Sequence, residues 1–272
     1  MRLMVAGRSV HLYNGGKNPA PDALARQPAV VFVHGVQQDH SCWTQQSRWF
    51  GHHGYGVLAP DLPGYGKSAG DALRSIEALA DWIAALLDAA GIAQAHVVGH
   101  SMGSLAALEF AVRHPARALS AALIGAALPM PVAPALLGAA RDDEARAAEM
   151  VNDWSFSAAG QFGGNRVPGL WMLGVNKRLM ARQKPGVFHA GLAACNAYGR
   201  TLESLATIAA PVLVIAGGRD RMTSPKAARA IAAAIPGARF VVLPGSGHAM
   251  MAERPDEVLD ALGDFIGGQG VS

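Results

Sequence analysis

The chain has 272 residues, of which 51% are hydrophobic and 16% are charged. That apolar fraction excludes a disordered protein, and the length fits a single core that carries an inserted subdomain. The formal net charge of +3 comes from lysines and arginines scattered along the sequence, a distribution unlike the clustered basic surface of a protein that binds nucleic acid.

Short apolar runs alternate with helical stretches along most of the chain. The run 29–33 lacks polar alternation, which is typical of a strand covered on both faces of a sheet. The predicted strands are 29–33, 56–59, 96–98, 118–124, 212–216 and 239–243, and the predicted helices are 43–53, 76–90, 104–114, 225–235 and 255–266. This alternation predicts an α/β fold with a doubly wound, mainly parallel sheet. Residues 2–12 predict an antiparallel hairpin at its edge.

The alternation stops over residues 128–205. Pro129, Pro131 and Pro134 mark the departure from the sheet, a helix-prone charged stretch follows at 141–151, and residues 154–171 are rich in glycine and aromatic side chains. Because this segment has no strand signal, we expect it to form a helical cap inserted into a core made of residues 1–127 and 206–272.

The most informative motif is Gly-His-Ser-Met-Gly at residues 99–103, between a predicted strand and a predicted helix. A Gly-x-Ser-x-Gly turn in that position holds its serine in a strained conformation, with the hydroxyl raised above the sheet. Such a serine is a nucleophile when a base lies within hydrogen-bond reach. Ser101 is therefore the candidate nucleophile.

Two further residues follow predicted strands and supply the partners that such a serine needs. Asp220 comes after the strand 212–216, and His248 comes after the strand 239–243 on a glycine-rich loop. The carboxyl ends of parallel strands lie along one edge of a sheet, so the three side chains can converge there. A serine nucleophile requires a histidine base oriented by an acid. The sequence thus predicts a catalytic triad of Ser101, Asp220 and His248.

With these residues in place, the sequence resembles the α/β-hydrolase superfamily over nearly its whole length outside the cap. The residues that carry the resemblance are His34-Gly35-Val36, Asp61-Leu62-Pro63-Gly64-Tyr65-Gly66-Lys67-Ser68, the serine turn, and Gly245-Ser246-Gly247-His248. The chain order Ser101, Asp220, His248 is the order of that superfamily. Asp61 lies in a Pro-Gly context that suits a turn-organising role, and it is the next candidate for the acid.

The resemblance implies an ester hydrolase that works through an acyl-enzyme. His248 would accept the proton of Ser101, and the backbone N–H groups of Val36 and Met102 would form the oxyanion hole. It implies no metal and no organic cofactor. No pair of histidines and no His/Asp cluster in the sequence suggests a metal site. The substrate would be a small carboxylic ester, a lactone or a thioester.

Contacts to substrate are predicted from the loops around this site. The candidates are His34, Gly35, Gln37, His100 and Trp154, although His34 also suits a role in ordering its loop and His100 suits packing beneath the serine turn. The apolar residues of the cap either pack it onto the core or line an apolar pocket.

Two other functions stay open at this point. One is a carbon–carbon bond hydrolase of aromatic degradation, which shares the triad and the cap but often has an aromatic residue where this chain has Ala249. The other is a ligand-binding receptor on a hydrolase scaffold.

The cysteines and the apolar runs bear on where the protein is located and how it assembles. Cys42 and Cys195 do not form a disulfide framework. The N-terminal residues lack the apolar core of a signal peptide, and no apolar run is long enough to span a bilayer. We expect a cytoplasmic protein, monomeric or homodimeric.

Overall fold

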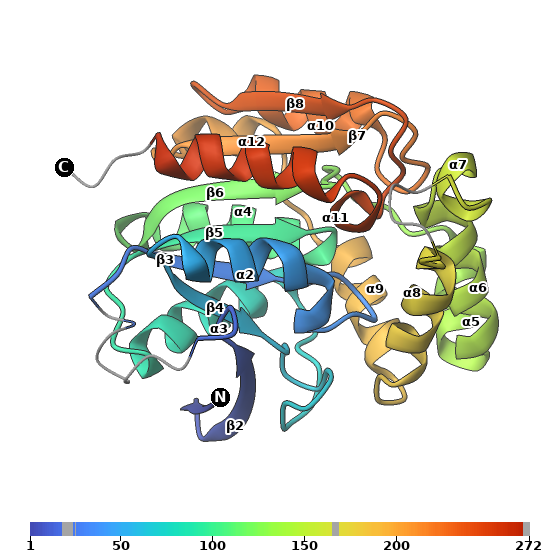
Figure 1. Cartoon of the computed structure of the whole chain (residues 1–272), viewed down its shortest axis with the longest axis horizontal. Coiled ribbons are helices and arrows are strands. Elements are labelled where there is room, and N and C mark those ends of the chain that lie inside the picture. The colour runs from blue at the N-terminus through green and yellow to red at the C-terminus, as the bar shows by residue number, and fades with distance from the viewer. Residues whose placement is uncertain (18–23, 25, 165–168, 269–272) are drawn as a thin grey trace.

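An eight-stranded sheet runs through the computed structural model, which describes residues 1–17, 24, 26–164 and 169–268 (Figure 1). The strands lie in the order β1-β2-β4-β3-β5-β6-β7-β8. Their bounds are β1 Arg2–Val5, β2 Arg8–Tyr13, β3 Ala29–Val33, β4 Gly56–Pro60, β5 Ala95–His100, β6 Ala118–Ile124, β7 Val212–Gly217 and β8 Arg239–Leu243. The six strands from β3 onward pair in parallel, which confirms the predicted doubly wound sheet.

The edge hairpin is also confirmed, because β1 and β2 pair antiparallel and β2 then pairs antiparallel with β4. β4 and β7 each extend one residue beyond the predicted range, and β5 is longer than its apolar run by three residues. β5 includes His96 and His100 at buried positions. The imidazole of His96 forms a 2.8 Å hydrogen bond with the hydroxyl of Ser120 on the neighbouring strand, which lets a polar side chain occupy a buried strand position.

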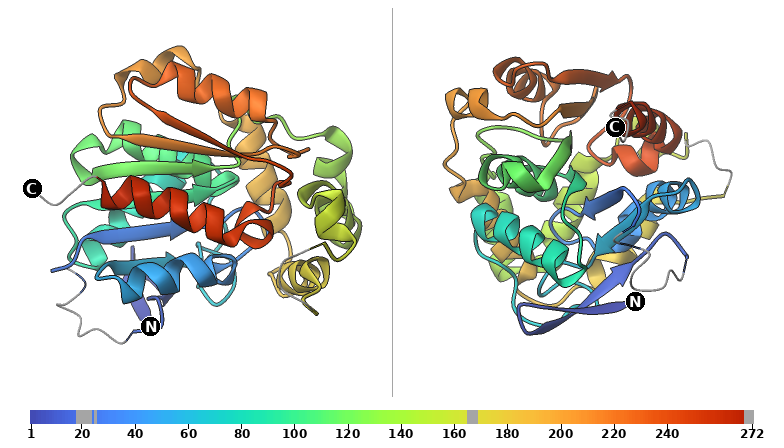
Figure 2. Two further views of the ribbon diagram at one scale, coloured as in Figure 1. Left: turned by 45° about the horizontal axis from the view of Figure 1, so that its top comes forward. Right: turned by 90° about the vertical axis from the view of Figure 1, so that its left-hand side faces the viewer.

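Helices cover both faces of the sheet, as Figure 2 shows from two further sides. Helices α3 (Ile76–Ala89), α4 (Met102–Arg113) and α10 (Pro225–Ala234) pack on one face. Helices α2 (Thr44–His52) and α12 (Pro255–Gly267) pack on the other, where their apolar side chains join those of β3 and β7. Short elements complete the core: η1 His40–Trp43, η2 Pro115–Arg117, η3 Glu203–Thr207 and α11 Met250–Glu253.

Between β6 and η3 the described residues form five α-helices, which we call the helical insertion. They are α5 Pro134–Asp142, α6 Glu144–Ser155, α7 Ala158–Gln161, α8 Met172–Ala181 and α9 Val187–Ala197. Figure 1 shows them gathered beyond one end of the sheet. The predicted single helix at 141–151 is two helices, because Asp143 leaves helical geometry and its side chain accepts the N–H of Arg146 at the start of α6. Aspartate is one of the residues that stabilise a helix most when it stands just before the first turn, as Asp143 does here.

Among the described residues, no helix combines the length and apolarity needed to cross a membrane.

The turn from β5 into α4 requires glycine at two positions. A Cβ atom on Gly99 would collide with the carbonyl of Gly103, and one on Gly103 would collide with the carbonyl of Val33. Because all of these obstacles are backbone atoms inside the core, they cannot move aside as a flexible side chain can.

We predict that Gly103→Ala lowers the free energy of unfolding by about 1–3 kcal/mol, the usual cost of overpacking a core. The control is Gly138→Ala on α5, where a Cβ would meet no atom within 4 Å. That variant should be about 0.5–1 kcal/mol more stable than wild type, because alanine favours helix. Urea denaturation of both variants provides the test, and equal stability of the two would contradict this view of the turn.

Candidate active site

Ser101 stands at the tip of the turn between β5 and α4. Its backbone has φ 54° and ψ −119°, in the left-handed region that a residue with a side chain rarely adopts. Two backbone hydrogen bonds stabilise this conformation. The N–H of Ser101 donates to the carbonyl of Ile124 at 2.9 Å, and the carbonyl of Ser101 accepts the N–H of Ser104 at 2.8 Å. A strained residue fixed in this way is typical of functional sites.

Asp220 and His248, which are distant in the sequence, meet after β7 and β8. Asp220 Oδ2 lies 2.8 Å from His248 Nδ1, and both side chains are buried. A carboxylate only accepts, so Nδ1 carries the proton and Nε2 has a lone pair with which it can accept one. His248 Nε2 is buried and has no hydrogen-bond partner among the described residues.

The carboxylate of Asp220 is held by groups other than the histidine. Its Oδ1 accepts the N–H groups of Met222 and Thr223 at 2.8 Å each, and Oδ2 also accepts the Thr223 hydroxyl at 2.7 Å. Burial alone would raise the pKa of Asp220, but the His248 ring and these donors lower it overall. The acid therefore stays ionised beside the imidazole.

The ring and backbone of His248 are fixed from two further sides. A Cβ on Gly125, just after β6, would lie 2.9 Å from His248 Cε1, so the ring rests on a residue with no side chain. His100 Nε2 lies 2.9 Å from the carbonyl of His248. Burial lowers the pKa of His100 to about 3, and the neutral ring donates this hydrogen bond through Nε2–H.

Two backbone N–H groups are free near Ser101. Neither the N–H of Val36 nor that of Met102 makes a hydrogen bond to another described residue. The loop that carries Val36 follows β3, and Met102 opens α4. Unused donors at the start of a helix and on an adjacent loop are suited to stabilising negative charge.

A cavity of about 210 Å³ lies over Ser101 and His248. Its walls come from the loop after β3, the turn after β5, the loops after β7 and β8, and the helical insertion. Of the five predicted substrate contacts, Gly35, His100 and Trp154 line it.

The other two predicted substrate contacts, His34 and Gln37, do not line the cavity. His34 is fully buried, where it accepts the N–H of Leu62 at Nε2 and donates to the carbonyl of Gly35 from Nδ1. Gln37 points away and donates to the carbonyl of Met180 at 3.2 Å. Both residues order the loop, and the lining of the cavity gives no support to their assignment as substrate contacts.

Sequence reasoning missed Gln38, Thr223 and Glu253. Gln38 and Thr223 line the cavity, but they lie in loops whose path no sequence pattern specifies. Glu253 is buried on α11, where Oε1 accepts the N–H groups of Ser157 and Gly247 and Oε2 accepts the Ser157 hydroxyl at 2.6 Å. A glutamate at this place in the sequence is indistinguishable from a surface residue.

These contacts join the helical insertion to the loop that carries His248. Glu253 connects Ser157 to Gly247, and the N–H of Ala249 donates to the carbonyl of Ser155 at 2.9 Å. The residues on both sides of His248 are therefore held by the insertion. A separate contact joins the insertion to the loop after β3, where Arg182 after α8 forms an ion pair with Asp39.

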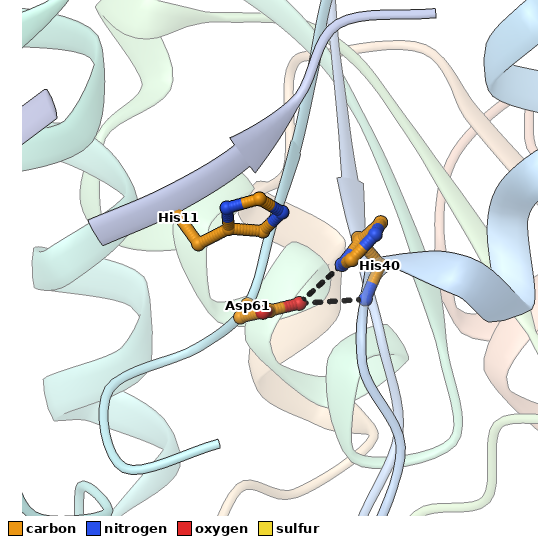
Figure 3. Close-up of side chains that lie close together, drawn as sticks. All are labelled: His11, His40 and Asp61. Carbon is orange, nitrogen blue, oxygen red and sulfur yellow. Dashed lines mark hydrogen bonds and ion pairs between the residues drawn. The ribbon is translucent and has the colours of Figure 1, made fainter. Parts of the chain in front are cut away.

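The structure also brings His11, His40 and Asp61 together, a His/Asp cluster that the sequence did not suggest because the three residues come from separate loops and strands (Figure 3). Asp61 Oδ1 accepts from His40 N–H at 3.0 Å and from His40 Nδ1 at 2.6 Å, and Oδ2 accepts from Lys67 N–H at 2.8 Å. Burial would raise the pKa of Asp61, but these donors hold it well below its usual range. With its oxygens occupied by protein donors, the carboxylate organises the turn.

The model of the α/β hydrolase family matches residues 30–261 of the chain. An enol-lactonase from Burkholderia xenovorans LB400 superposes with a TM-score of 0.85 at 26% identity, covering 98% of this chain and 100% of that one.

Two curated relatives are similar in sequence. A 2-hydroxy-6-oxononadienedioate/2-hydroxy-6-oxononatrienedioate hydrolase from Paraburkholderia phymatum is 29% identical over 267 residues, which cover 90% of this chain and 89% of that protein. The dihydrolipoyllysine-residue acetyltransferase component of the acetoin cleaving system from Cupriavidus necator is 32% identical over 249 residues. That match covers 88% of this chain but only 63% of the relative's length.

We predict that Glu253→Ala lowers kcat for hydrolysis by up to about 100-fold with little change in KM, because His248 is the candidate base and a small displacement of a catalytic group has an effect of that size. Glu253→Gln keeps an oxygen for the two N–H groups and should recover most of the loss. Exposed Glu149 on α6 supplies the control, Glu149→Ala. Steady-state kinetics of the three variants, with thermal melts, make the comparison. A wild-type kcat in Glu253→Ala would show that this carboxylate does not position the base.

Proposed function

The chain belongs to the α/β-hydrolase family, and on that premise we propose that it is a serine hydrolase that cleaves a small carboxylic ester or lactone through an acyl-enzyme. Ser101 is the nucleophile, His248 the base and Asp220 the acid that orients it. The observation that carries the proposal is the 2.8 Å contact between Asp220 and His248, which leaves Nε2 without a hydrogen-bond partner among the described residues, on a histidine that lines the same cavity as Ser101.

The first half of the reaction forms the ester of Ser101. His248 Nε2 accepts the hydroxyl proton as Ser101 Oγ attacks the carbonyl carbon, and Asp220 stabilises the imidazolium that results. The N–H groups of Val36 and Met102 donate to the oxyanion, and each such donor contributes about 3 kcal/mol in the transition state. As the intermediate collapses, His248 gives the proton to the leaving alcohol.

The second half releases the acid. Water enters the position that the alcohol has left, and His248 Nε2 accepts one of its protons as the oxygen attacks the acyl carbon. Collapse of the second tetrahedral intermediate returns that proton to Ser101 Oγ. The net reaction consumes one ester and one water and yields one alcohol and one carboxylic acid.

Carbon–carbon bond hydrolysis is the second candidate, supported by the similarity to the Paraburkholderia phymatum hydrolase over 90% of this chain. The same base and nucleophile would serve that reaction. The two candidates separate when the purified protein receives, in parallel, a short alkyl ester and a 2-hydroxy-6-oxo-dienoate, whose ultraviolet absorption disappears on cleavage.

A receptor that binds without turnover is disfavoured by the geometry. The Asp220 carboxylate has four donors around it and the His248 ring is held on several sides, an arrangement that binding alone does not require.

We predict that Asp220→Asn lowers kcat/KM for 4-nitrophenyl butyrate by about 10⁴-fold, and that Ser101→Ala, which removes the nucleophile, lowers it by about 10⁶-fold. In Asp220→Asn the amide keeps the size of the side chain but no longer fixes the imidazole tautomer. Release of 4-nitrophenol is the measurement.

The matched control for this test is Asp61→Asn, at another buried carboxylate, which follows β4. It should lower thermal stability while kcat falls far less than in Asp220→Asn. Near-normal activity of Asp220→Asn together with an inactive Asp61→Asn would move the role of the acid to Asp61.

A further inference from the structure

A second cavity of about 700 Å³ adjoins the one over Ser101. Gln38, Asn176 and Ala249 line both cavities. The catalytic cavity, at about 210 Å³, is smaller than the roughly 300 Å³ at which small-molecule sites usually begin. The catalytic cavity alone therefore accommodates only part of a substrate of ordinary size, and the adjoining cavity has room for the remainder.

One wall of the second cavity is apolar. It comes from the helical insertion and α11, through residues that include Phe156, Trp171, Met172, Leu179 and Met251. The opposite wall, from η1 and the start of α2, is mostly polar.

The apolar wall of the second cavity extends to the surface of the protein. Trp171 and Val175 are 65% and 57% exposed, although large apolar side chains in contact with water raise the free energy of the protein. Both residues line the cavity. A bound apolar group would cover part of their surface.

The position of His248 decides which half of an ester enters this cavity. In the proposed reaction, His248 gives its proton to the leaving alcohol, so the alcohol lies against the loop that carries the histidine. Ala249, the next residue in this loop, lines both cavities. A group attached to the leaving oxygen thus has a route past Ala249 into the second cavity.

We propose that the second cavity binds the alcohol portion of the substrate, and that this portion is an apolar group of the size of a medium-length alkyl chain. The proposal rests on the function proposed above, since it assigns the two halves of an ester to two sides of Ser101. The acyl portion occupies the smaller cavity.

Two series of esters test this assignment. In the first, the alcohol lengthens from methyl acetate to hexyl acetate, and in the second the acid lengthens from methyl acetate to methyl heptanoate. For the wild type, kcat/KM should rise by roughly fourfold for each methylene added to the alcohol, the usual gain from burying that group. The acid series should level off early because its cavity is small.

Two variants alter the second cavity without touching the proposed catalytic groups. Val175→Glu places a charge in its apolar wall, and Ala252→Trp adds bulk at a residue that lines it. Both positions are exposed, so the fold should tolerate the changes. Lys177→Gln is the matched control, because it makes the same change in net charge on α8 at a residue that lines neither cavity.

In Val175→Glu and Ala252→Trp, the rise along the alcohol series should flatten, while methyl acetate is cleaved as by the wild type. Lys177→Gln should keep the full rise. A flat alcohol series in the wild type, or a rise that both cavity variants retain, would overturn the assignment. So would a rise along the acid series that Val175→Glu removes.

A different result would show that the proposed function itself is wrong. If wild type and Ser101→Ala are equally inactive on methyl acetate and on every longer ester, the protein is not an ester hydrolase, and the assignment of the second cavity falls with it.

Discussion

The close approach of β5, α4 and β3 is the constraint on which the site depends. Gly103 lies against the backbone of β3, and Gly99 lies against the backbone of Gly103. A side chain at either position would separate these elements. Their contact sets the sharp turn at Ser101 and places its hydroxyl at the cavity, near the N–H groups of Val36 and Met102.

The second constraint is the way in which the base is held. His248 has Asp220 on its ring, Gly125 beneath it and His100 on its carbonyl. The helical insertion holds the residues on either side of it through Ser155 and Glu253. The insertion thus has two roles: it supplies the apolar walls of both cavities, and it fixes the loop that carries the proposed base. A movement of the insertion would therefore alter substrate binding and the position of the base together.

The sheet and the proposed triad could be predicted from the sequence because local patterns specify them. Runs such as 29–33 are apolar throughout, and the glycines around Ser101 are the only residues that fit the turn. Asp220 and His248 follow strands, and the parallel sheet brings strand ends together. These predictions needed only the order of elements and the chemistry of a few residues.

The remaining features depend on how loops fold over one another, which the sequence does not specify. His34 and Gln37 lie in the expected loop but point into the protein, whereas Gln38, the next residue, faces the cavity. Glu253 becomes important only when Ser157 of the insertion lies beside it. The contact between His40 and Asp61 likewise joins two loops. The path of the insertion determines the size of both cavities, and glycines and aromatics alone did not predict it.

In the proposed mechanism, His248 makes the hydroxyl of Ser101 nucleophilic. The most direct test is to treat the protein with an alkyl fluorophosphonate, which phosphonylates activated serines, and to locate the adduct by mass spectrometry of peptides. We expect one adduct, on Ser101, that forms quickly in the wild type and is greatly slowed in His248→Ala. An unmodified Ser101, or labelling at the same rate in both proteins, would contradict this mechanism.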